Sequence, residues 1–225
     1  MIALICGMAM AQTPLDAAGV LERTRQAYSN CKTYRDTAEI ALVELRHGKP
    51  WTIKRRIKTF FSAPDQIRIE HDQERKSGAP DLMVLWTENG SYRTWWSLMP
   101  GVHIHRDREP AFRWAREVMG RGMHIADLLL GGPQADWTAA SLAGEPELLP
   151  DAKVGGRTCY TVVLPKARRT KIWIDKATFL IRKTHTPLPP QNRHVEVTSS
   201  YSPEVGVALP ASAFGFKPGQ PSAGR

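Results

Sequence analysis

The sequence lacks the short motifs that mark most nucleotide-binding and hydrolytic sites. It contains neither glycine-rich phosphate-binding pattern, G-x-G-x-x-G or G-x-x-x-x-G-K-[ST], and it has no G-x-S-x-G elbow and no H-E-x-x-H helix. A catalytic site would have to be built from residues that no local pattern reveals. We therefore expect a protein that is not an enzyme and that uses no cofactor.

Charge is absent from residues 1–11, which are almost wholly apolar. This composition is typical of a secretory signal peptide, and the stretch is too short to span a bilayer. Ala9 and Ala11 have the small-x-small spacing that signal peptidase reads, so we expect cleavage before Gln12 and a periplasmic mature chain. No Lys or Arg precedes the apolar run, which suggests that the true start lies upstream. A buried N-terminal strand or helix is the alternative.

Cysteine is scarce, with three in 225 residues. Cys6 follows Ile5, where a lipidation peptidase needs a small residue, so we expect no lipid anchor. Cleavage would leave Cys31 and Cys159 in a compartment where disulfides persist. They can pair only if their Cα atoms lie within about 7 Å of each other. Two small buried hydrophobic residues are the equal alternative.

Acidic residues are outnumbered, 22 against 31 Lys and Arg, which gives a formal charge of +9 and a pI near 9.7. Anionic surfaces should therefore attract the protein. For an exported chain, phospholipid head groups or an acidic protein partner are better candidates than nucleic acid, which we do not expect. The basic residues are mostly scattered, as on a solvated face.

The apolar residues recur with two spacings. Helical spacing covers residues 13–28, where Thr13 is the expected cap and Ala17, Ala18, Leu21, Thr24 and Tyr28 form the apolar stripe, and residues 110–130 predict two more helices. Elsewhere the period is two, and Asn89-Gly90 is a strong hairpin signal. We place strands near residues 34–42, 51–61, 66–72, 82–87, 92–98, 148–154, 157–164, 170–174, 179–186 and 193–201.

About nine antiparallel strands with helices at the start and in the middle predict a mainly β fold with helices, of the α+β class. We expect a strongly curved antiparallel sheet, or unclosed β-barrel, covered by a helical lid. Residues 12–216 would form a single domain, and residues 217–225 a disordered tail.

A lid over a curved sheet would enclose apolar side chains. The best candidates for contact with a ligand lie on the lid: Phe112, Trp114, Val118 and Met119. Candidates on the sheet come second: Met83, Leu85, Trp96, Leu98 and Met99. Aromatic and Met side chains suit a promiscuous apolar site, but core filling is the simpler interpretation for any one of them.

A metal site has weaker support. His103 and His105 alternate on one strand, so both rings would face one side and could bind a metal together with His124 or Asp127. No further hydrogen-bonding partner for these rings can be named, and exposed strand histidines are common, so we expect no metal site.

Several short motifs follow one another in a characteristic order between residues 34 and 218. They are Tyr34-Arg35-Asp36, Ala63-Pro64-Asp65-Gln66-Ile67-Arg68, Trp86-Thr87-Glu88-Asn89-Gly90 with Trp95, residues 156–165, Ile172-Trp173-Ile174-Asp175 and Phe214-Gly215-Phe216-Lys217-Pro218. Their order resembles that of the LolA/LolB-like periplasmic lipoprotein-carrier superfamily, especially its outer membrane lipoprotein-sorting members. Typical carriers place an Arg directly before the strand-opening Pro, where this chain has Ala63.

The resemblance implies an unclosed barrel with a helical lid over an apolar cavity that accepts acyl chains, and we add Arg68 to the ligand-binding candidates. The expected function is a periplasmic carrier or binder of lipid or of the acyl chains of lipoproteins, in lipoprotein sorting or envelope maintenance. A regulatory module of the same fold, which binds a protein partner in envelope-stress signalling, is the alternative. A metal-dependent hydrolase is a third and weaker hypothesis.

Overall fold

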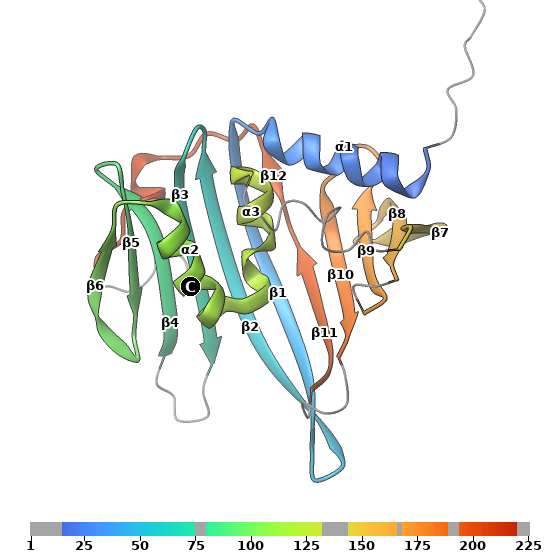
Figure 1. Cartoon of the computed structure of the whole chain (residues 1–225), viewed down its shortest axis with the longest axis horizontal. Coiled ribbons are helices and arrows are strands. Elements are labelled where there is room, and N and C mark those ends of the chain that lie inside the picture. Colours follow the sequence, from blue (N-terminus) through green and yellow to red (C-terminus); the bar gives the residue numbers. More distant parts are fainter. Residues whose placement is uncertain (1–14, 75–79, 132–143, 166–167, 189–193, 220–225) are drawn as a thin grey trace, which may run out of the picture.

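The computed structural model describes residues 15–74, 80–131, 144–165, 168–188 and 194–219, which form one antiparallel sheet of twelve strands together with helices (Figure 1). Eleven strands follow the order β6-β5-β4-β3-β2-β1-β11-β10-β9-β8-β7, and β12 pairs with β1. The strands are β1 (Thr33–Arg46), β2 (Lys49–Ser62), β3 (Gln66–Glu74), β4 (Pro80–Glu88), β5 (Ser91–Trp96), β6 (Met99–His105), β7 (Glu147–Val154), β8 (Arg157–Leu164), β9 (Thr170–Asp175), β10 (Ile181–Pro187), β11 (His194–Tyr201) and β12 (Glu204–Val205).

The sheet is open, because β6 and β7 end it on opposite sides of the molecule (Figure 1). This curved antiparallel sheet with helices on one face confirms the predicted fold class. The ten ranges placed from the sequence each overlap a strand of the sheet, and the two strands that were not expected are β6 (Met99–His105) and the short β12 (Glu204–Val205). The Asn89-Gly90 turn between β4 and β5 has positive φ at both residues, as the hairpin signal predicts.

Helix α1 (Ala17–Ser29) lies across one end of the sheet (Figure 1). Its cap is Asp16, whose carboxylate accepts a hydrogen bond of 2.7 Å from the backbone N–H of Gly19. The expected cap, Thr13, lies outside the described residues. The predicted stripe is right except at one position, since Val20 is buried and Ala18 is exposed.

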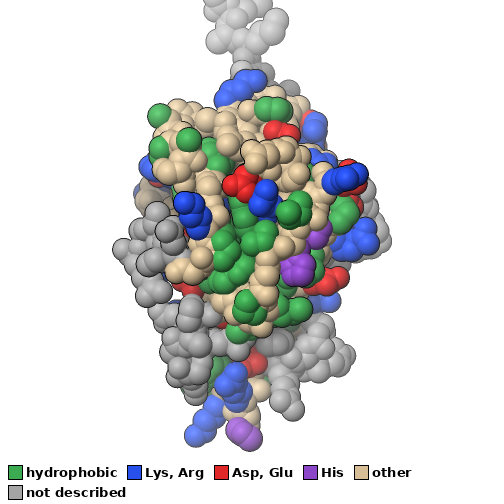
Figure 2. Space-filling model, turned by 90° about the vertical axis from the view of Figure 1, so that its left-hand side faces the viewer, with side chains coloured by type: hydrophobic (Ala, Val, Ile, Leu, Met, Phe, Trp, Pro, Cys, Tyr) green, Lys and Arg blue, Asp and Glu red, His purple; other side chains and the backbone are tan. Residues whose placement is uncertain are grey.

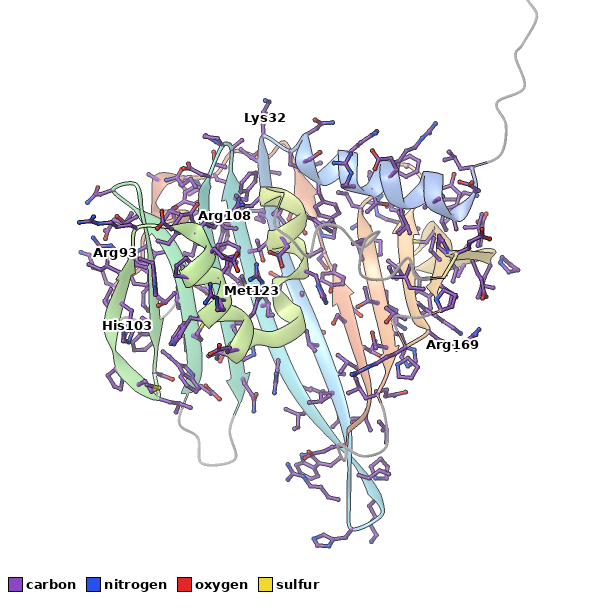
Figure 3. All side chains as sticks on the ribbon, in the orientation of Figure 1. Lys32, Arg93, His103, Arg108, Met123 and Arg169 are labelled. Carbon is purple, nitrogen blue, oxygen red and sulfur yellow. The ribbon has the colours of Figure 1, made fainter. Side chains whose placement is uncertain are left out.

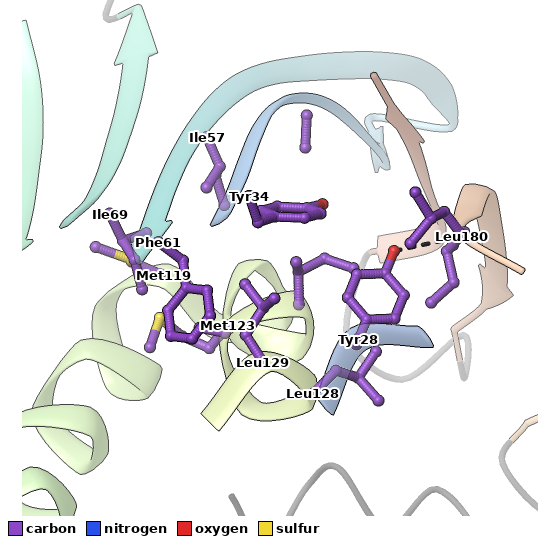
Figure 4. Packing of buried hydrophobic residues seen from close by; sticks show 14 of the residues in the cluster. Tyr28, Tyr34, Ile57, Phe61, Ile69, Met119, Met123, Leu128, Leu129 and Leu180 are labelled. Carbon is purple, nitrogen blue, oxygen red and sulfur yellow. Dashed lines mark hydrogen bonds between the residues drawn. The ribbon is translucent and has the colours of Figure 1, made fainter. Parts of the chain in front are cut away.

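Two further helices cover the concave, inner face of the sheet: α2 (Arg108–Met119) and α3 (His124–Leu130), joined by the short 3-10 helix η1 (Gly120–Met123) (Figure 1). We call α2, η1 and α3 together the lid. Both α-helices agree with the prediction for residues 110–130. Figure 4 shows Met119, Met123 and Leu129 of the lid packed against Phe61 and Ile69 of the sheet.

The possible disulfide between Cys31 and Cys159 is not formed: both residues are free and buried. Cys31 lies two residues before β1, whereas Cys159 lies in β8, and β11, β10 and β9 lie between these two strands in the sheet. Four steps of about 4.8 Å between neighbouring strands separate them by far more than a disulfide can bridge. The alternative interpretation, two small buried hydrophobic residues, is therefore the right one.

The predicted leader, its cleavage site and residues 220–225 of the predicted tail lie outside the described residues. Within the described part of the chain, no helix combines the length and the apolar character that crossing a membrane requires.

Candidate functional site

The space between the lid and the sheet is filled by apolar side chains in the described part of the chain. Four of the predicted ligand-contacting residues are at most 2% exposed and belong to one continuous core cluster: Phe112, Met119, Met83 and Leu85. For these four residues the core-filling interpretation holds in the closed structure. An apolar ligand could reach them only if the lid moved away from the sheet.

The other five apolar candidates form the edge of this core. We call them the lid margin: Trp96, Leu98, Met99, Trp114 and Val118. The ring of Trp96 on β5 meets the ring of Trp114 on α2 edge to face, with centroids 6.5 Å apart. Leu98 and Met99, at the turn into β6, are 38% and 55% exposed. The margin therefore joins the buried core to an apolar surface that solvent reaches.

Two polar contacts hold the lid helices to each other. Arg116 on α2 forms an ion pair of 3.0 Å with Asp127 on α3, and Arg108 at the start of α2 donates a 2.6 Å hydrogen bond to the carbonyl of Leu130 at the end of α3. Burial raises the pKa of Asp127, while Arg116 acts in the opposite direction. Because both contacts lie within the lid, they join its two α-helices into one unit.

A row of polar side chains crosses the inner face next to the margin. His71 is 2% exposed, and neither of its ring nitrogens has a hydrogen-bond partner among the described residues. Burial and the charge of Arg55 lower the pKa of His71 to about 4, whereas Asp81 acts in the opposite direction. Asp81 accepts a 2.7 Å hydrogen bond from the indole N–H of Trp96. Sequence reasoning did not identify His71 or Asp81, because each is an isolated polar residue in a strand pattern.

Arg68 does not line the space beneath the lid. Its neighbours Ile67 and Ile69 face the core, so the period of two directs Arg68 to the outer face of the sheet. There its guanidinium pairs with Glu70 and donates to the carbonyl of Gly215, and it lies 5.7 Å from the ring centroid of Phe216. Arg68 thus fixes the C-terminal segment, and the alternation of Arg68 with Ile67 and Ile69 is the sequence signal that could have placed it on the outer face.

The histidines proposed as metal ligands do not form a cluster. No group of three or more metal-ligating side chains is present among the described residues. His105 shares a 3.1 Å hydrogen bond with Thr94, and the ring of His103 lies 5.9 Å from that of Trp114. Asp127 is engaged by Arg116. Figure 3 shows His103 on the β6 side of the molecule.

An open pocket of about 510 Å³ lies away from the lid margin, at the turns that precede β3 and β5. The C-terminal segment closes one side of it through Ala211, Phe214 and Gly215. None of the predicted ligand-contacting residues lines it. Tyr92 is the lining residue that borders the lid, because its ring packs edge to face against that of Phe112.

No family model matches the chain, and no curated protein matches its sequence. Among solved structures, a LolA superfamily protein from Nitrosomonas europaea is 10% identical, with 90% of this chain and 99% of that chain covered and a TM-score of 0.37. LprF from Mycobacterium bovis is 7% identical, with 86% and 94% covered and a TM-score of 0.45. The MucA/MucB complex from Pseudomonas aeruginosa is 13% identical, with 89% and 61% covered and a TM-score of 0.49. A LolA superfamily protein is thus among the solved structures to which this chain is similar.

Proposed function

We propose that this chain is an exported, periplasmic binding or carrier protein for an apolar ligand, either a lipid or the acyl chains of a lipoprotein, and that it serves lipoprotein sorting or envelope maintenance. The observation that carries the proposal is the lid margin, an apolar surface with two tryptophans that continues directly into the core beneath a separate helical hairpin.

Acyl chains suit this arrangement energetically. Each methylene that leaves water contributes about 0.8 kcal/mol, so a long apolar groove binds an acyl chain without any catalytic group. The side chains that a displaced lid would uncover include Met83, Met119 and Met123, and flexible Met side chains adapt to ligands of different shape. The ligand would replace lid side chains on the inner face of the sheet.

Polar groups beside the margin provide a place for the head of such a ligand. Arg55 is half-buried, and its Nε has no hydrogen-bond partner among the described residues. Both ring nitrogens of the adjacent His71 also lack a hydrogen-bond partner there. Donors in this position can bind the ester, amide or acid oxygens at the end of an acyl chain. We therefore place the acyl chain under the lid and its head near Arg55.

The test is binding of a fluorescent long-chain fatty acid by a pair of matched variants. Trp114→Asp introduces a charge into the lid margin, whereas Arg113→Asp introduces the same residue one position earlier, on the exposed side of α2. We expect Trp114→Asp to weaken binding at least tenfold and Arg113→Asp to change it less than twofold, with circular dichroism unchanged in both. Equal affinity of the two variants would refute the assignment of the margin.

A further inference from the structure

The edge strand β6 differs from the rest of the chain in its content of charged residues. Residues 95–105 contain no Asp, Glu, Lys or Arg, although 24% of all residues are charged. Soluble proteins usually protect an exposed sheet edge with charged residues, because its unpaired N–H and C=O groups attract other strands. β6 carries no such charge, and its edge is protected only by Pro100, which lacks an N–H, and by the irregular pairing with β5 between Met99 and His103.

The same strand and its turn carry much of the exposed apolar surface. Of the eight large hydrophobic residues that are exposed in the described part of the chain, four lie here: Leu98, Met99, Val102 and Ile104. Ile104 is 62% exposed, the largest fraction among them. Figure 2, which views the molecule from this side, shows hydrophobic side chains gathered in one field with charged groups around it. Such a field on a soluble protein usually marks an interaction surface.

The chemistry of the edge identifies the kind of partner. A row of backbone donors and acceptors is best satisfied by another extended strand, and alternating apolar side chains select an apolar strand. A second β6 has both properties. Each chain carries a net charge of +9, which opposes self-association over most of the surface, but the uncharged edge brings no like charges into contact.

We propose that β6 is a homodimerisation edge, at which two copies of this chain pair antiparallel about a two-fold axis. This continues the sheet from one copy into the other, and the same residues serve on both sides, as two-fold symmetry requires. An axis through His103 places Val102 of each copy opposite Ile104 of the second copy. Ile104 lies on the outer face, because it pairs with the outward-facing Arg93 of β5. The proposal rests on Val102 and Ile104, which lie outside the lid margin, so it is independent of the ligand under the lid.

Sedimentation equilibrium of the full chain over a range of concentrations tests the proposal. The wild type should show about twice the chain mass of 25.2 kDa. Ile104→Lys should shift the molecule to the monomer mass and weaken association at least tenfold, without lowering thermal stability, since Ile104 is exposed. Leu148→Lys is the matched control at the opposite edge strand, β7, where Leu148 is 41% exposed, and it should leave the dimer intact. A monomeric wild type, even one that binds vesicles or another protein through this surface, would overturn the proposal, as would equal effects of the two variants.

A cross-link tests the register. In a Cys6→Ser background, His103→Cys places a thiol on the axis, where directly opposite residues of an antiparallel pair have Cα atoms about 4.5–5.5 Å apart, within disulfide range. Mild oxidation should convert His103→Cys into a covalent dimer and leave a Leu148→Cys control monomeric on a non-reducing gel. Absence of a His103→Cys dimer would overturn the register, and cross-linking at Leu148→Cys instead would move the interface to β7.

Discussion

Arg116 and Asp127 form an ion pair of 3.0 Å that joins the two lid helices, and the Asp127 side chain is completely buried. Asp127 also has one carboxylate oxygen without a hydrogen-bond partner among the described residues. Each charge of the pair compensates the other. Removing one partner therefore destabilises the protein, because the other charge stays buried without compensation.

Arg116→Met should lower the free energy of unfolding by about 3 kcal/mol, because Asp127 would remain buried without its cation. Adding Asp127→Leu should recover most of this loss, since the double variant buries no charge. Urea denaturation of both variants and of Asp127→Leu alone completes the cycle. A double variant as unstable as Arg116→Met would show that the ion pair does not couple the helices.

His71 makes stability depend on pH. Its folded pKa of about 4 lies below the unfolded value of about 6.5, so the unfolded state binds the proton first as pH falls. The stability that the neutral ring contributes is fully present above pH 6.5 and is lost as pH falls to 4.

The substitution His71→Leu tests this pH dependence. A leucine suits the position, because residue 71 lies between Ile57 and Met83 on the neighbouring strands. Relative to wild type, the variant should gain about 3 kcal/mol in the free energy of unfolding between pH 7 and pH 4. Asp36, whose pKa burial raises to about 6, has the opposite pH dependence but is the same in both proteins and cancels in the difference. A difference that stays constant with pH would contradict the assignment.

The two buried thiols should be unreactive in the folded protein. Burial raises the pKa of Cys31 to about 11 and also raises that of Cys159, so both are protonated at neutral pH. In a Cys6→Ser background, a thiol reagent at pH 8 should label neither residue in the native state and both after denaturation without reductant. Failure to label two thiols in the denatured chain would indicate a disulfide.

Local patterns were sufficient for most elements of the fold. Strand β8 (Arg157–Leu164) has the predicted bounds, and α2 and α3 lie where the period of two is interrupted. Boundaries that depend on a single side chain were less predictable: the cap of α1 is Asp16, because its carboxylate reaches the N–H of Gly19. Thr13, a hydroxyl residue before a proline, was an equally reasonable candidate for this cap.

The candidate site was predicted only in part, because periodicity shows which residues share a face but not what covers that face. Phe112 and Met119 were recognised as apolar lid residues, yet only the packed structure shows that side chains of the sheet already fill the space beneath them. Arg68 was placed with them although it faces outward toward Phe216. The position of β6 at the edge of the sheet could not be predicted, because it depends on the order of the strands, which is a non-local property.

Native mass spectrometry tests the central claim, binding of an apolar ligand, most directly. The chain would be purified without detergent from a Gram-negative periplasm, and any bound molecule would be extracted with solvent and identified. The account predicts a co-purifying acylated molecule, or stoichiometric uptake of added lipid that Trp114→Asp abolishes. A bare protein mass with no uptake of added lipid would contradict it and would favour the protein-binding regulatory module.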